Sequence, residues 1–273
     1  MILGKILRET DLKPFLGFVS PAFFDVMPSR SIASVARQLL RNYRDRERFS
    51  EALAQRRKTL STVPLAVELD DSAGPDDSAG SARPPSRWAQ PEHPGRFSEG
   101  VVELYFHQVY HPGPVLADLR ASALVPIANG SGWRPAPVYA EWEPDFLEAL
   151  RELYRGFYAG DDPAFRAALR ALNLSAAESQ FRHHFGAGQE AVRFRMSDFI
   201  ATFQEVFLVC KDARATLPPG FIFLGVYLAA MYENLDRIEE GVDVRSRFDV
   251  VVGSESLKSA TSAEAGDARA DGG

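Results

Sequence analysis

Between residues 144 and 238 the sequence is a succession of amphipathic patterns separated by short breaks, and this feature most constrains the fold. Residues 145–158 follow Pro144 and bring Phe146, Leu150 and Leu153 to one side of a helix. The same reasoning predicts further helices over residues 164–174, 175–186, 195–213 and 218–238. Because only short turns separate these segments, the region predicts a helical bundle and a mainly α fold class.

Two segments indicate where the core of this bundle lies. Residues 218–238 are apolar nearly all round until Glu233, which is typical of a central helix. Cys210 lies in another apolar run and is the only cysteine, so we expect a buried small hydrophobe. A single cysteine also excludes an intramolecular disulfide and any cysteine-cluster metal site.

Composition divides the rest of the chain. Residues 70–98 contain the repeat DDSAG twice, followed by Ser, Pro, Arg and Gly without an apolar face, which predicts a disordered acidic linker. Residues 1–69 form an N-terminal aromatic and basic helical segment, and residues 99–250 form the bundle. Residues 251–273 have the composition of a disordered tail.

The N-terminal segment carries aromatic and positively charged patterns. Prolines interrupt residues 12–28, so we expect short helical turns that lay phenylalanines, among them Phe23 and Phe24, on the main body. A membrane-surface anchor is the alternative. Residues 29–58 approximate one amphipathic helix, and nine Lys or Arg against three acids lie between Arg30 and Lys58.

This basic helix is the candidate contact surface of the chain. Its candidate partner-binding residues are Arg37, Arg41, Arg44 and Arg48. Such a helix binds an acidic protein partner or an anionic membrane surface. A solvated face of a core-packed helix is the alternative interpretation.

Charge and hydropathy exclude some classes of protein. The net charge is −6, whereas nucleic-acid-binding proteins are usually basic, so no nucleic acid is expected as a partner. No apolar run approaches the roughly 18 to 20 residues of a membrane-spanning helix. We therefore expect a cytoplasmic protein, with peripheral membrane association as an option. The oligomeric state does not follow from the sequence.

Three side chains recur at helical spacing before a His-Pro-Gly-Pro turn, namely Glu103, His107 and His111. Imidazole and carboxylate groups on one helical stripe are possible ligands for iron, manganese or zinc. The three positions span about 12 Å along a helix axis, so one ion can take only a neighbouring pair together with ligands from elsewhere. The alternative is a structural role, with the histidines half exposed or hydrogen-bonded. No nucleophile elbow, phosphate-binding loop or dinucleotide fingerprint occurs in the sequence.

The layout of residues 105–238 resembles the C-terminal helical lobe of the AarF/UbiB family of atypical kinases. The similar pieces are His107, His111-Pro112-Gly113, Gly160-Asp161 and Leu217-Pro218-Pro219. The chain differs from the family at the positions of its catalytic and metal-binding residues. Val109 and Tyr110 stand where Asp-Pro is expected, Pro114 stands in place of the asparagine, and there is no Asp-Phe-Gly.

The resemblance implies a pseudokinase-like remnant connected with isoprenoid-quinone or membrane-lipid metabolism, because phosphoryl transfer needs its magnesium ligands. The sequence thus predicts a non-catalytic binding or regulatory helical module. The alternative is a helical-bundle, metal-dependent enzyme that acts on a hydrophobic substrate, with its site near His107 and His111.

Overall fold

The computed structural model describes residues 20–62, 67–69, 91–127, 130–187 and 190–253, and its fold is mainly α. The N-terminal elements are α3 (Pro21–Val26), α4 (Ser29–Arg44), α5 (Arg46–Leu60) and β1 (Val67–Leu69). Next come α6 (Pro94–Tyr110), β2 (Val115–Leu116), β3 (Leu124–Ile127), β4 (Gly130–Trp133) and β5 (Tyr139–Ala140). The remaining elements are α7 (Pro144–Ala159), α8 (Asp162–Ala171), η1 (Ser175–Ala177), α9 (Glu178–His184), β6 (Val192–Arg193), α10 (Met196–Asp212), α11 (Gly220–Asp236) and β7 (Gly241–Val242). Residues 244–253 are also helical.

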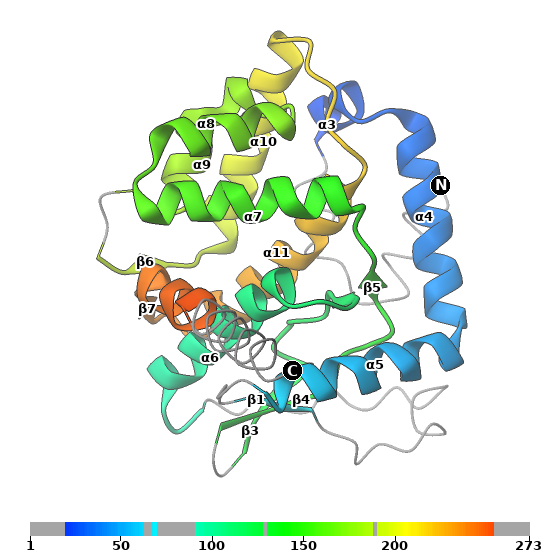
Figure 1. The fold of residues 1–273 in the computed structure, drawn as a ribbon, viewed down its shortest axis with the longest axis vertical. Coiled ribbons are helices and arrows are strands. Elements are labelled where there is room, and N and C mark those ends of the chain that lie inside the picture. Colours follow the sequence, from blue (N-terminus) through cyan, green and yellow to red (C-terminus); the bar gives the residue numbers. More distant parts are fainter. Residues whose placement is uncertain (1–19, 63–66, 70–90, 128–129, 188–189, 254–273) are drawn as a thin grey trace, which may run out of the picture.

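Helix α11 occupies the centre of the molecule. In Figure 1 the helices α7, α8 and α9 lie on one side of it, α4 runs along the opposite edge, and α5 crosses below. Every residue of α11 from Phe221 to Tyr232 is buried, as the sequence predicted for a central helix. Although α11 is this apolar, no helix in the described ranges is long and apolar enough to cross a membrane.

Helix α6 is a second internal helix. The sequence indicated helical spacing at Glu103, His107 and His111 but not the burial of the helix. It is buried almost continuously from Phe97 to Tyr110. It begins at Pro94, and therefore within the last residues of the segment that we assigned to the linker. Residues 70–90 of that segment lie outside the described residues, as do residues 254–273 of the tail, while residues 251–253 are helical.

The N-terminal segment shares its core with the bundle. Phe23 of α3 packs edge-on against Phe207 of α10, with 5.4 Å between ring centroids. The backbone amide of Leu217 donates to the carbonyl of Val26 at 3.0 Å. One continuous hydrophobic core therefore contains residues of α3, α4 and α5 together with the helices that follow.

Short strands connect the helices. Strand β4 pairs with β1 in parallel and with β3 in antiparallel fashion, while β2 pairs with β5 and β6 with β7. Strand β1 has three residues, and β2 and β5 have two residues each. The β3–β4 hairpin was not predicted, because its short runs contain Pro and Gly and show no clear alternation.

The prediction of one basic helix over residues 29–58 is wrong in one respect, since the chain breaks at Asp45. The backbone of Asp45 is not helical (φ −90°, ψ 85°), and its carboxylate accepts a hydrogen bond from the amide of Arg48 at 3.1 Å. Aspartate is a favourable N-cap residue, so a new helix begins directly after it. As a result, α4 and α5 meet at a corner (Figure 1).

Candidate functional site: an arginine face on α4

Helix α4 carries an exposed line of arginines on the side turned away from the core. Val35 and Leu39 lie on its buried side, with 4% and 5% of their surface exposed. Arg30, Arg37, Arg41 and Arg44 are all exposed, and their spacing of seven, four and three residues puts them on the opposite side. At a rise of 1.5 Å per residue this arginine face is about 21 Å long.

Local contacts fix the orientation of α4. Its one buried polar side chain, Asn42, donates from Nδ2 to the carbonyl of Tyr139 in β5 at 2.8 Å. Because α4 is anchored through Asn42, Val35 and Leu39, a rotation about the helix axis would expose apolar surface and break this bond. The arginine face therefore has a fixed direction outward.

At the corner of α4 and α5 the arginine face borders a shallow groove of about 660 Å³. The groove is lined by Arg37, Leu40, Arg41, Arg44, Asp45, Arg46 and Glu47. Arg37 Nε donates to the carbonyl of Ala33 at 3.1 Å. Arg37, Arg41 and Arg44 form no ion pair with any residue that the structure describes. Their positive charge is thus available to an external anion.

Not every sequence-predicted arginine lies in this groove. Arg48 is exposed on α5, outside the lining, and its Nε is 3.9 Å from the carboxylate of Asp45. The structure thus brings Arg37, Arg41 and Arg44 together and separates Arg48 from them. Arg46 lines the groove and was not singled out from the sequence, because the helix break before it was not recognised.

Exposed aromatic side chains lie near both ends of α4. The expectation that Phe23 and Phe24 both pack on the body holds for Phe23 only, since 57% of the surface of Phe24 is exposed. Tyr43, in the last turn of α4, is 42% exposed. Next to Phe24, Asp25 pairs with Lys211 of α10 at 2.8 Å, which joins the exposed sides of α3 and α10.

The histidine stripe of α6 lies inside the protein. Glu103, His107 and His111 are 7%, 0% and 7% exposed, so the expected half-exposed histidines are not observed. The rings of His107 and His111 lie against each other, with 4.2 Å between centroids. The carboxylate of Glu103 instead accepts from Arg247 Nη1 at 3.0 Å. Burial raises the pKa of Glu103, and the ion pair with Arg247 opposes that effect.

These contacts determine which of the three side chains are available as ligands for a metal ion. The described residues contain no group of three His, Cys, Asp or Glu side chains placed to hold one. His107 and His111 are close enough to act as a pair, whereas Glu103 is engaged with Arg247. A metal site at Glu103, His107 and His111 therefore stays a prediction.

An internal cavity lies between α6, α7, α9 and α11. Its volume is about 30 Å³, which is the space of one or two water molecules and too small for an organic substrate. Tyr105 and Tyr154 share a hydrogen bond between their hydroxyls, and Tyr232 OH lies 3.2 Å from His184 Nδ1. The cavity is thus a feature of the packed core.

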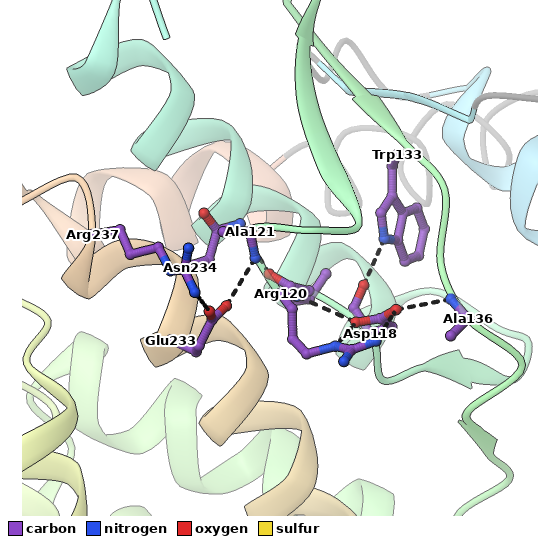
Figure 2. A network of polar contacts seen from close by, with 9 residues as sticks. Asp118, Arg120, Ala121, Trp133, Ala136, Glu233, Asn234 and Arg237 are labelled. Atoms are coloured by element: carbon purple, nitrogen blue, oxygen red, sulfur yellow. Dashed lines mark hydrogen bonds and ion pairs between the residues drawn. The ribbon is translucent and has the colours of Figure 1, made fainter. Parts of the chain in front are cut away.

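A buried polar network joins the segment after β2 to α11 and to the region beyond β4 (Figure 2). Asp118 accepts from Arg120 Nε at 2.6 Å and from the amide of Ala136 at 2.8 Å. From α11, Glu233 accepts from the amide of Ala121 at 2.9 Å, and Asn234 donates to Leu119 O at 2.9 Å. These bonds hold irregular backbone in place, so we assign the network a structural role.

Sequence reasoning did not find this network, because its members are far apart in the chain and belong to no known motif. The buried Trp133 is part of it, since its Nε1 donates to Asp118 O at 2.8 Å. Trp133 and Trp142 are both buried, with 0% and 8% of their surfaces exposed. Compared with models of known protein families and with curated protein sequences, the chain matches none.

Proposed function

We propose that this protein is a non-catalytic binding module that docks on an anionic membrane surface through the arginine face of α4. The observation that carries the proposal is that Arg37, Arg41 and Arg44 point away from the core without an ion pair among the described residues. Guanidinium groups bind phosphate and carboxylate oxygens through several hydrogen bonds at once.

The geometry favours an extended surface over a small ligand. The arginines form a nearly straight line of about 21 Å on the outer edge of the molecule, and an open groove lies beside them. Lipid headgroups present a plane of negative charge, and each nearby Lys or Arg contributes about 1 kcal/mol of attraction. The exposed ring of Phe24 lies five residues before α4 and supplies an apolar contact of the kind found at membrane interfaces.

The resemblance to the AarF/UbiB helical lobe supports the same proposal. It implies a module that acts in membrane-lipid or quinone metabolism without phosphoryl transfer of its own. A regulatory role follows as part of the proposal, because a module without catalytic residues acts by binding.

Sedimentation with lipid vesicles tests the proposal. The wild-type chain is expected to bind vesicles containing about 30% phosphatidylserine and to bind pure phosphatidylcholine weakly. Exchange of Arg37, Arg41 and Arg44 for Glu is expected to weaken binding about a hundredfold or more, since each lost arginine removes about 1 kcal/mol. The matched control reverses the exposed arginines Arg170, Arg193 and Arg245, which changes the net charge equally and is expected to leave most of the binding.

Two results would contradict the proposal. Equal losses in the test and control variants would assign the binding to net charge and remove the role of α4. An absence of binding to every vesicle would overturn the membrane as partner and direct the search to an acidic protein that fits the same arginine face.

The alternative function is a metal-dependent enzyme with its site near His107 and His111. The close contact of the two buried imidazoles is the observation that favours it. It predicts iron, manganese or zinc in stoichiometric amount in the purified protein, and its loss on changing His107 to Ala. Metal analysis by mass spectrometry separates the two proposals, because the binding module needs no metal.

A further inference from the structure

Arg56 is a charged side chain in the core of the molecule. It belongs to α5, whose other Lys and Arg residues are exposed, yet none of its surface is accessible. Its Nη2 donates to the carbonyl of Pro114 at 2.8 Å. Burial lowers the pKa of Arg56 to about 10, so the guanidinium still carries its charge at neutral pH.

The described residues do not supply enough acceptors for this guanidinium. Its Nε and Nη1 atoms are buried without a hydrogen-bond partner, and no carboxylate of the described chain pairs with it. Arg247 shows the usual arrangement, since it is partly buried and pairs with Glu103 at 3.0 Å. A buried charge without a partner costs several kcal/mol. Arg56 therefore needs acceptors from outside the described residues.

Nearby acceptors are already engaged. Gln108 Oε1 accepts from the amide of Leu116 at 2.8 Å. The hydroxyl of Tyr227, close enough to Arg56 for each to affect the pKa of the other, accepts from Gln108 Nε2 at 2.7 Å. The same hydroxyl donates to the carbonyl of Tyr105 at 3.3 Å. Neither oxygen accepts a hydrogen bond from the guanidinium in the structure.

A second buried donor belongs to a side chain that contacts Tyr227. Trp142 packs against Tyr227, with 6.4 Å between ring centroids, and its Nε1 is buried without an acceptor. On another side, the turn at Gly113 comes close to the guanidinium, since a Cβ on Gly113 would lie 3.4 Å from Arg56 Nη2. The junction of α5, α11 and the segment after β5 thus combines positive charge with an excess of N–H donors.

We infer that this junction is a binding site for a small anion, with the Arg56 guanidinium as its main ligand and Trp142 Nε1 as a further donor. A carboxylate or an inorganic phosphate supplies several lone pairs and one or two negative charges, which is what the junction lacks. This site is separate from the arginine face of α4, since Arg56 points into the core.

Thermal unfolding of the full chain tests the inference. Sodium acetate, sodium phosphate and sodium chloride are compared at one ionic strength, which distinguishes the two oxyanions from each other and from a halide. At ten times its dissociation constant, the preferred anion is expected to raise Tm by about 3–6 °C with a saturable dependence. The rise is expected to persist when Arg37, Arg41 and Arg44 are changed to Glu.

Variants of the junction connect the rise in Tm to Arg56. Arg56→Met keeps the length of the side chain and is expected to abolish the anion-dependent rise. Lys58→Met removes an exposed cation from the same helix and is expected to keep it. If Arg56→Met does not fold, Trp142→Phe serves instead, with the half-saturating anion concentration expected to increase about three- to tenfold. An identical Tm in all three anions, or an unchanged dependence in the junction variants, would overturn the inference.

Discussion

Asp118 shows how one buried carboxylate holds an irregular segment in place. It is 3% exposed, binds Arg120 through two nitrogen atoms and accepts from the amide of Ala136 (Figure 2). Removal of the Asp118 carboxylate takes a buried acceptor away from the Arg120 guanidinium and from the amide of Ala136. Asp118→Ala is therefore expected to lower the free energy of unfolding by about 3–5 kcal/mol, measured by urea denaturation.

A surface ion pair provides the matched control for Asp118. Glu148 lies 3.5 Å from Arg151, and 56% of its side chain is exposed. Because solvent screens such a pair, Glu148→Ala is expected to change the free energy of unfolding by less than about 1 kcal/mol. A loss as small as this for Asp118→Ala would show that the network does not hold the fold together.

His184 gives stability a dependence on pH. Burial, together with a smaller effect of the neighbouring His183, lowers the pKa of His184 to about 4. The ordinary histidine pKa is about 6.5, so the unfolded chain binds a proton that the folded chain excludes as the pH falls through the range between these values. The stabilising effect of a neutral His184 is thus fully present above about pH 6.5 and is lost toward about pH 4.

Phenylalanine at position 184 keeps the stacking on Tyr232 and removes the titration. Between pH 7 and pH 5 the wild-type chain is expected to lose about 1–2 kcal/mol more of its unfolding free energy than His184→Phe. Urea denaturation at both pH values measures this difference. Equal losses in the two proteins would assign the pH dependence to other groups.

Among the elements, α7 and α8 are packed so closely that a glycine is required at their contact. A Cβ on Gly156 of α7 would lie 2.5 Å from the backbone nitrogen of Phe165 in α8. Gly156→Ala is expected to lower the free energy of unfolding by about 2–3 kcal/mol, because backbone cannot move aside as a side chain can.

Gly95, in the first turn of α6, is the control for this packing argument. A Cβ there meets no heavy atom within 4 Å, so Gly95→Ala is expected to raise the free energy of unfolding by up to about 1 kcal/mol. Denaturant titrations of both variants compare the two sites. If Gly156→Ala and Gly95→Ala had the same free energy of unfolding, the close approach of α7 and α8 would be contradicted.

The helices and strands differ in how well local sequence patterns predict them. The helices from α7 to α11 follow from apolar periodicity, which is a local property of the chain. The break at Asp45 had a local signal in the capping aspartate, and it was overlooked because the basic pattern continues on both sides of it. The short strands have too few residues for a period, and tertiary pairing decides them.

For the whole molecule, contacts between distant segments decide which polar residues are internal. The arginine face of α4 was predictable, since spacings of three, four and seven residues place charges on one side of a helix. The burial of Arg56 within the same basic run was not predictable from its neighbours. The environment of Arg56 is formed by Pro114, 58 residues away, and by Tyr227 and Gln108, which are hydrogen-bonded to each other.

The proposed function places α4 against the lipid surface and so sets the orientation of the whole molecule, which a fluorescent label can report. Ser34 is exposed on the arginine face between Arg30 and Arg37, and Ala167 is exposed on α8, on the other side of α11 (Figure 1). The single cysteine, Cys210, is buried and its pKa is raised to about 11 by burial, so a thiol-reactive dye is directed to a new cysteine.

The most direct test of this orientation is the emission of a polarity-sensitive dye on Ser34→Cys as anionic vesicles are added. If α4 lies on the membrane, we expect a blue shift that is absent with neutral vesicles and is reversed by about 0.5 M salt through charge screening. The same dye on Ala167→Cys is expected to show no shift. Binding of the protein to anionic vesicles without any change in emission at position 34, or with the larger change at position 167, would contradict docking through the arginine face of α4.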